Sequence, residues 1–221
     1  MSVRELAKQE RVDRALNAAR AILRRDGLDG LQIRSIADEA GLAVRTLYNQ
    51  FGGGKSDVLL ALMSQELNEL SAELDALKLD DGIEMSRAII TVSIERFRAS
   101  EDMMRPLMAL TYASSDKGTT MLANQARGLQ EFAIAKAIRQ RQLDDLVPAT
   151  VLAHLVLDAY SNAGHRWARG SIDHEGFEAQ ALHTWSCLLL GLAKGETRTR
   201  MEAEIQRLAP RMQELVKAAQ T

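Results

Sequence analysis

The window from residue 33 to residue 55 limits what this chain can fold into more than any other part of its sequence. Its first half carries apolar or small residues at spacings of three and four, which places them on one face of a helix over residues 33–40. Gly41 follows where that helix must end, because glycine adopts the left-handed conformation of a helix terminus without a steric cost. Leu47 continues the buried side into a second short helix over residues 44–50. The window therefore predicts a helix-turn-helix, a motif that lays its second helix in the major groove of DNA.

The residues of this window are more specific than the motif requires. The pattern A-x-x-x-G-L-x-x-x-T-L-Y-x-x-F, which begins at Ala37 and ends at Phe51, resembles the DNA-binding domain of the tetracycline-repressor (TetR) family of bacterial regulators. This resemblance implies an all-α fold, in which an N-terminal three-helix helix-turn-helix domain is joined by a long fourth helix to a C-terminal helical domain for ligand binding and dimerisation. The domains expected from it are a DNA-binding domain at residues 1–54, an effector-binding and dimerisation domain at 55–195, and an additional helical segment at 196–221.

The composition fits such a regulator in the cytoplasm. The chain has 221 residues, of which 46% are hydrophobic, enough for a sizeable core. No apolar run approaches the roughly 20 residues of a membrane-spanning helix, and the first ten residues hold no apolar signal core. A single cysteine, Cys187, cannot form an intrachain disulfide. We therefore expect a cytoplasmic protein that has no membrane partner.

The net charge of −2 is divided unevenly along the chain. Residues 1–60 hold ten Lys and Arg against eight Asp and Glu, a net of +2, whereas the remaining 161 residues hold 18 against 22, a net of −4. This modest asymmetry favours contact between DNA phosphates and the N-terminal end.

Apolar periodicity predicts the remaining helices. They cover residues 5–25, a long fourth helix with one apolar seam from Leu59 to Leu77, and residues 83–99, 101–113, 119–143, 149–169 and 174–194. From Met201 a further apolar stripe is interrupted by Pro210, which removes a hydrogen bond inside a helix. We expect two short helices packed on the body, with Pro210 opening the second; the alternative is an extra dimer contact.

The resemblance implies which residues contact a double-stranded DNA operator. Arg45 is the candidate for reading a base, because its guanidinium can bond guanine O6 and N7 together; a phosphate contact is the alternative. Thr46 and Tyr48 stand where the family touches the DNA backbone, although the Tyr48 ring could instead be buried. Lys55 begins the fourth helix, whose N-terminus favours a phosphate. The predicted DNA-binding residues are Gln32, Arg34, Ala43, Val44, Arg45, Thr46, Tyr48, Asn49 and Lys55.

Three features depart from the family pattern. In the family, position 43 is usually Ser or Thr and position 32 is often Thr, whereas this chain has Ala43 and Gln32. Losing such a helix cap costs about 1 kcal/mol unless another group replaces it. Three glycines separate Phe51 from Lys55, where relatives usually have two residues, and this extra residue can move Lys55 away from its usual phosphate.

The resemblance also implies a homodimer, built as a four-helix bundle from the helices at 149–169 and 174–194. Small residues permit close helix approach, and an apolar stripe follows in the second helix; the alternative is that both fill the core of one subunit. The predicted interface residues are Ala159, Ala163, Gly164, Trp185, Leu188, Leu189 and Leu192.

A small, largely apolar effector is expected in the body, where methionines and aromatic residues share helical faces. Methionine suits an adaptable pocket, although such a stripe can equally be plain core. Three polar residues recur every four positions inside an apolar helix, and a buried carboxylate among them needs a partner, which could be a ligand cation, a cross-dimer bond or water. The predicted ligand-binding residues are Phe97, Met103, Met104, Met108, Tyr112, Met121, Phe132, His154, Asp158 and Asn162.

The expected function is that of a repressor released from its operator by the effector. An activator or a ligand-independent DNA-binding protein remains open, because fold does not settle regulation. An enzyme is the weaker alternative: His154, Asp158, His183 and Cys187 could be assembled into a triad or metal site, but no nucleophile elbow, phosphate loop or paired-cysteine spacing supports one. We therefore expect no catalytic residue, no metal and no cofactor.

Overall fold

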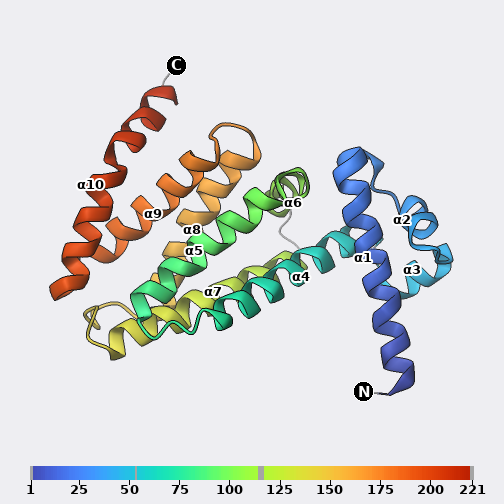
Figure 1. The fold of residues 1–221 in the computed structure, drawn as a ribbon, viewed down its shortest axis with the longest axis horizontal. Coiled ribbons are helices and arrows are strands. Elements are labelled where there is room, and N and C mark those ends of the chain that lie inside the picture. The colour runs from blue at the N-terminus through green and yellow to red at the C-terminus, as the bar shows by residue number, and fades with distance from the viewer. Residues whose placement is uncertain (1, 53, 114–116, 220–221) are drawn as a thin grey trace.

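The computed structural model describes residues 2–52, 54–113 and 117–219, and it describes side chains outside residues 110–119. The described chain is all-α (Figure 1). Its ten helices are α1 (Val3–Gly30), α2 (Ile33–Ala40), α3 (Val44–Gln50), α4 (Lys55–Ala76), α5 (Gly82–Ala99), α6 (Glu101–Ala113), α7 (Lys117–Arg139), α8 (Ala149–Ala168), α9 (His174–Leu190) and α10 (Gly195–Ala218).

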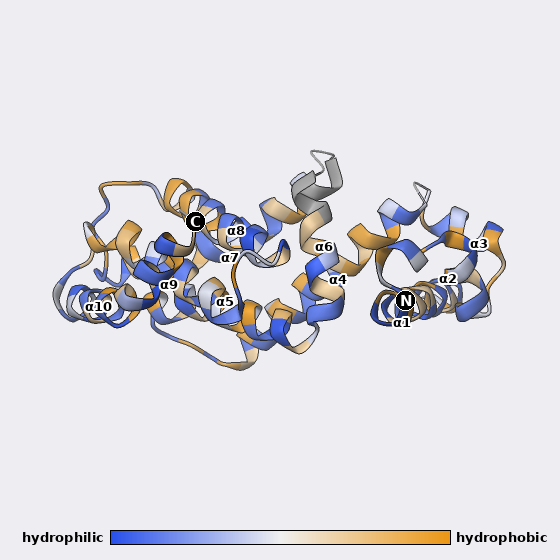
Figure 2. Ribbon diagram, turned by 90° about the horizontal axis from the view of Figure 1, so that it is seen from above, coloured by the Kyte–Doolittle hydropathy of each residue, from blue (hydrophilic) through white to orange (hydrophobic). Residues whose placement is uncertain are grey.

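The helices form an elongated arrangement with the helix-turn-helix unit at one end. Figure 1 shows α1, α2 and α3 together at that end, α4 running from them under the body, and α10 on the outside of the opposite end. Both end helices, α1 and α10, are hydrophilic on average. Figure 2, which views them nearly end-on, places them at opposite ends of the molecule. The division into domains at residues 1–54, 55–195 and 196–221 stays a prediction. No described helix is both long and apolar enough to span a bilayer.

The turn between α2 and α3 has the geometry that the sequence predicts. Gly41 adopts a left-handed conformation, with φ 62° and ψ 41°. The amide of Leu42 donates to the carbonyl of Ala37 at 2.9 Å, and the amide of Gly41 donates to that of Asp38 at 3.2 Å. These two bonds form a Schellman motif, which satisfies carbonyls that the end of α2 would otherwise leave free. The bounds predicted for α2 and α3 are confirmed.

Two of the later helices end earlier than the periodicity predicts. α7 stops at Arg139 and α9 at Leu190, because the segments that follow them pair with each other. Leu143 and Ala193 form an isolated antiparallel bridge, in which the amide of Asp144 donates to the carbonyl of Leu192 at 2.8 Å. Apolar residues such as Leu143 continue the helical pattern in the sequence but are buried by this long-range pairing instead.

The C-terminal segment is one helix, so the prediction of two short helices is wrong. Pro210 lies inside α10, which continues to Ala218 and packs along α9. Proline removes one helical hydrogen bond, to the carbonyl four residues earlier. Pro210 and Gln206 are both exposed, so water can satisfy that carbonyl while the buried side of α10, at Met201, Leu208 and Leu215, stays continuous.

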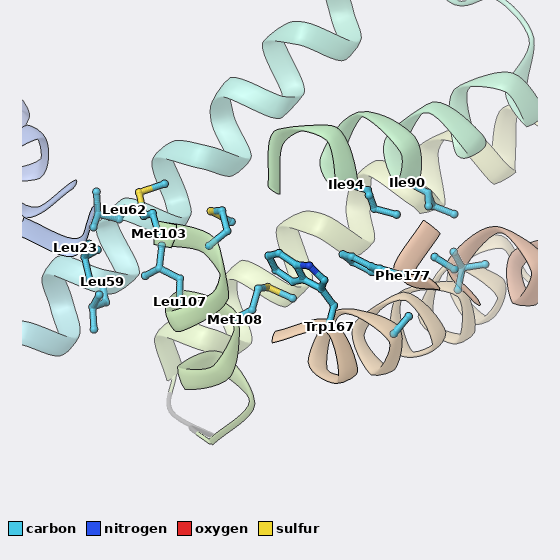
Figure 3. Packing of buried hydrophobic residues seen from close by; sticks show 14 of the residues in the cluster. Leu23, Leu59, Leu62, Ile90, Ile94, Met103, Leu107, Met108, Trp167 and Phe177 are labelled. Atoms are coloured by element: carbon cyan, nitrogen blue, oxygen red, sulfur yellow. The ribbon is translucent and has the colours of Figure 1, made fainter. Parts of the chain in front are cut away.

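The core is continuous from the helix-turn-helix unit into the body, and α6 lies at the junction. Met103 and Leu107 of α6 are 1% exposed and point toward Leu23 of α1 and Leu59 and Leu62 of α4 (Figure 3). Met104 and Met108, which follow these two residues in the sequence, face the body and line its cavity. One helix therefore contributes to the core on both sides of the junction and packs directly on α1.

Candidate DNA-binding surface and ligand cavity

The helix-turn-helix unit has one completed apolar face and one exposed polar face. Ile36, Ala37 and Leu47 are fully buried between α1, α2 and α3. The side of α3 that points away from them carries Arg45, Tyr48 and Asn49, all exposed. Tyr48 is 53% exposed, so the alternative of a ring buried in the core is wrong for this chain.

The remaining predicted DNA contacts surround this face, with two exceptions. Gln32, Arg34 and Ala43 are exposed and Thr46 is half-buried. Val44 is turned partly into the core, where it packs on the buried cluster. The structure therefore brings most of the predicted set onto one surface, formed by the start of α2 and by α3.

The missing helix caps leave backbone donors at this surface. Gln32 and Ala43 occupy the N-cap positions of α2 and α3, and neither side chain caps its helix within the described residues. The first amides of a helix have no partner inside the helix. At a surface of this kind a DNA phosphate can supply the missing acceptor, and this contact is worth the most at low salt.

The second exception is Lys55, which the structure turns inward. Its ammonium group donates to the carbonyl of Leu28, close to the break in α1 at Gly27. The extra glycine before α4 offers the reason, since Gly54 holds the N-cap position of α4 with a positive φ of 72° and Lys55 is thereby the first residue of the helix. A phosphate contact by Lys55 would require breaking an internal hydrogen bond, so the structure does not favour that role.

Arg14 supports the surface from behind, and the sequence analysis missed it. Its Nε donates to the carbonyl of Ala40 at 3.1 Å, and its Nη2 to that of Gly41 at 3.0 Å. The guanidinium thus holds the end of α2 and the following turn against α1. No local pattern indicates this role, because the partners lie 26 and 27 positions away.

The body contains a cavity of about 260 Å³ between five helices. Its lining is mostly apolar and comes from α4, α5, α6, α7 and α8. Polar groups gather on two sides: the hydroxyls of Ser93 and Tyr160 share a hydrogen bond of 2.9 Å, and Gln130 is bonded to Ser86 behind the wall. Such a concave, mainly apolar site with a few polar groups is the usual form of a small-molecule pocket.

Three of the ten predicted ligand residues line this cavity, namely Phe97, Met104 and Met108. Met103 faces the helix-turn-helix junction instead (Figure 3). Met121 and Phe132 are 61% and 59% exposed, because they lie on the outer side of α7, while Leu122 and Leu129 of the same helix face inward. The side chain of Tyr112 lies outside the described residues.

The polar stripe of α8 does not reach the cavity, which corrects its assignment to the ligand site. His154, Asp158 and Asn162 lie on the solvent side of the helix, and the first two side chains are 54% and 63% exposed. His154 pairs with Asp158 at 3.4 Å, so the carboxylate is neither buried nor in need of a ligand. The opposite side of α8 supplies the lining, through Val156 and Tyr160.

Cavity residues that the sequence analysis missed come mainly from α4, α5 and α7. Met63, Leu67 and Leu70 of α4 lie on the apolar seam that the sequence does predict. Glu66 and Arg96 are the charged residues among the described ones that line the cavity, and they pair with each other at 2.8 Å. Burial alone would lower the pKa of Arg96, but hydrogen bonds to Glu69 and Glu66 outweigh it and raise that pKa above its ordinary value.

Most of the predicted dimer residues are buried inside the single chain. Ala163 and Leu189 are fully buried, and Trp185 donates its indole N–H to Ser86 at 2.9 Å in the core. Gly164 faces Met108 and Phe177, where an added Cβ would lie 2.9 Å from the methionine methyl carbon. The alternative that these residues fill the core of one subunit therefore holds for them. Ala159, Leu188 and Leu192 are partly exposed.

The residues considered for an enzyme do not form a catalytic set. Cys187 lies 3.7 Å from Nδ1 of His183, and burial raises the pKa of its thiol, which favours the unreactive protonated form. His154 and Asp158 form a separate pair on α8. Across the described residues, no group of three or more potential metal ligands comes together.

Residues 15–62 match the family model described as bacterial regulatory proteins, tetR family. The HTH-type transcriptional repressor KstR of Mycobacterium tuberculosis is 26% identical over 133 residues. That match covers 60% of this chain and 60% of the repressor's own length.

Solved structures share the fold over most of the chain. A TetR transcription regulator from Haloarcula marismortui is 18% identical with a TM-score of 0.68, covering 84% of this chain and all of its own. Thermus thermophilus FadR, a TetR-family repressor solved with lauroyl-CoA, is 22% identical with a TM-score of 0.68, covering 83% of this chain and 96% of its own.

Proposed function

We propose that this chain, which belongs to the TetR family of bacterial regulators, is a repressor that binds a DNA operator as a homodimer and leaves it when a small, largely apolar molecule occupies the cavity. The observation that carries the DNA-binding part is the exposed face of α3. Arg45, Tyr48 and Asn49 are exposed on a helix whose other side is anchored in the core by Leu47, which is the arrangement that groove binding needs.

The cavity supports the effector part of the proposal. Its apolar lining favours a molecule with a substantial hydrocarbon portion, because burial of apolar surface supplies most of the binding energy. Thermus thermophilus FadR was solved with lauroyl-CoA, a ligand with such a portion. The repressive sign of regulation is supported by the KstR relative, which is named a repressor.

The exposed side of α8 supports a dimer, at a position that differs from the residues first predicted. Val151 and Leu155 are 45% and 43% exposed, four residues apart on the same side as Asp158 and Asn162. An exposed apolar pair beside polar groups is typical of an interface. Two copies joined there would present two α3 helices to the half-sites of an operator.

The test is selection of a binding site from a pool of random duplexes, followed by affinity measurement on the selected site. We expect sequence-specific binding that weakens with salt, with a log–log slope of about −0.9 for each phosphate neutralised. Arg45→Ala should lose about 1–3 kcal/mol at one base pair if it reads guanine. Arg198→Ala, which removes an exposed arginine of α10, is the matched control and should leave affinity unchanged.

One result would contradict this proposal, and another would change the role given to Arg45. Equal affinity for selected and scrambled duplexes would exclude a specific operator. A loss in Arg45→Ala that is equal on every sequence would make Arg45 a phosphate contact and not a base reader.

A further inference from the structure

One carboxylate joins the helix-turn-helix unit to the body. Glu66 lies on α4, and its Oε1 accepts from Nη2 of Arg20 on α1 at 3.0 Å. Its Oε2 accepts from Nη2 of Arg96 on α5 at 2.8 Å. The side chains of Glu66 and Arg20 are each 15% exposed, so water screens these pairs only weakly. Glu66 is thus a common partner of one arginine in each half of the molecule.

Two further carboxylates of α4 complete this network, which we call the Glu66 clasp: Arg20, Glu66, Glu69, Glu73 and Arg96. The three glutamates are spaced by three and four residues, so they share one face of α4. Glu69 lies 3.5 Å from Arg20 and 2.7 Å from Arg96, and Glu73 lies 3.3 Å from Arg96. Each arginine is held by more than one carboxylate, which fixes its planar head group in one orientation.

The clasp also forms part of the cavity wall. Glu66 and Arg96 line the cavity, whereas Arg20 lies beyond it on α1. A molecule in the cavity can therefore contact the same side chain that pairs with Arg20 of α1. A second route is available through α6, where Met104 and Met108 face the cavity and Met103 packs at the junction with α1 and α4 (Figure 3).

We propose that occupancy of the cavity is transmitted to the DNA-binding surface through the Glu66 clasp. The proposal rests on the proposed function and names the regulation of the same site. A molecule that displaces Glu66 or Arg96 changes the geometry at Arg20, and α1 then takes a different position on α4. Because α1 carries α2 and α3, the spacing of the recognition helices in a dimer changes with it, and the population shifts between the two spacings.

A double-mutant cycle tests the clasp without any ligand. Operator affinity would be measured by fluorescence anisotropy for Arg20→Gln, Arg96→Gln and the double variant, on the selected duplex. Each single change should alter Kd by about 5-fold or more, the lower end of typical coupling between sites. The Kd of the double variant should differ from that of the wild type by no more than the Kd of the more strongly affected single variant does, because both arginines act through Glu66.

The matched control is Arg98→Gln, which removes an exposed arginine of the same helix whose partner is Glu95 at 3.4 Å. Its Kd should stay within about 2-fold, the small effect usual for an exposed pair. Thermal unfolding of every variant separates a change of affinity from a loss of folding. Single variants without effect, or effects that multiply in the double variant, would overturn the proposal.

A second experiment adds a probe, N-phenyl-1-naphthylamine, whose fluorescence reports entry into an apolar site. Wild-type protein should bind the probe and lose operator affinity by about 5-fold or more. Arg20→Gln, which breaks the clasp at the residue that does not line the cavity, should still bind the probe while its operator affinity no longer responds. If Arg20→Gln responds as the wild type does, transmission runs by another route, such as α6, and the clasp proposal is wrong.

The same data separate this inference from the function on which it rests. A wild-type protein that binds the selected duplex but not the probe contradicts the apolar effector, and the ligand-free cycle still decides the clasp. A wild-type protein without specific duplex binding contradicts both.

Discussion

Two basic side chains hold the helix-turn-helix from the inside, and they show how far a residue's role depends on its partners. Arg14 donates to carbonyls at the end of α2, and Lys55 donates to the carbonyl of Leu28. From the sequence alone, both could be assigned as DNA contacts, since both are cations in the N-terminal 60 residues. In the structure both side chains bind backbone carbonyls inside the unit, so they stabilise the DNA-binding surface and do not project from it.

Replacing Lys55 by methionine should therefore weaken folding more than DNA binding. Removal of the ammonium leaves the Leu28 carbonyl without a charged donor, and hydrogen bonds to charged groups contribute about 1.5–3 kcal/mol. We expect a lower free energy of unfolding by chemical denaturation and an unchanged salt slope for operator binding. A shallower salt slope in Lys55→Met would instead indicate that Lys55 contacts a DNA phosphate.

Tyr48→Phe is the opposite case. Tyr48 is exposed on α3, so loss of its hydroxyl should lower operator affinity and leave the free energy of unfolding unchanged.

Among the helices, two glycines make opposite demands. Gly82 opens α5 against α7, where an added Cβ would lie 2.3 Å from the amide nitrogen of Ala137. Gly128 lies in the middle of α7 with no atom within 4 Å of such a Cβ. The first position requires glycine for close helix approach, and the second does not.

Gly82→Ala should lower the free energy of unfolding by about 1–3 kcal/mol, because backbone atoms must move to admit the methyl group. Gly128→Ala should raise it by about 0.5–1 kcal/mol, the difference in helix propensity between the two residues. Urea unfolding of both variants checks the pair. Similar changes in the two variants would mean that the crossing of α5 and α7 is not as close as described.

Pro210 is the corresponding test for α10. Pro210→Ala restores a helical hydrogen bond at an exposed position, so stability should increase, by up to about 3 kcal/mol on the propensity scale. Thermal unfolding followed by circular dichroism measures this change. A decrease would indicate that a local bend at Pro210 is needed to seat Leu215 against the body.

At the scale of the whole molecule, the exposed apolar pair of α8, Val151 and Leu155, is where a second copy should bind. We expect a homodimer at micromolar concentration, and Leu155→Glu should convert it to a monomer, because a charge would be buried in the interface. Sedimentation velocity measures the state directly. Val216→Glu, which alters an exposed apolar residue of α10, is the control and should stay dimeric. A monomeric wild type, or a Leu155→Glu variant that remains dimeric, would place the interface elsewhere.

The sequence predicts well where structure depends on neighbours within a few residues. The bounds of α2 and α3, the left-handed Gly41 and the absence of caps at Gln32 and Ala43 all follow from local spacing and backbone preference. The apolar seam of α4 likewise anticipates Leu67 and Leu70 in the cavity wall. The family resemblance rests on this same local stretch, which is why fold and class of function could be predicted together.

The tertiary structure decides where side chains on both apolar and polar faces of the body helices point. His154 and Asp158 recur at helical spacing, but periodicity cannot say whether that side meets the cavity or solvent, because α8 is apolar on more than one side. Trp185 and Gly164 fit an interface and a core equally well until α5, α6 and α9 are placed around them. The inward turn of Lys55 and the joint hold of Arg20 and Arg96 on Glu66 depend on contacts between residues 27 to 46 positions apart, which leave no local signal in the sequence.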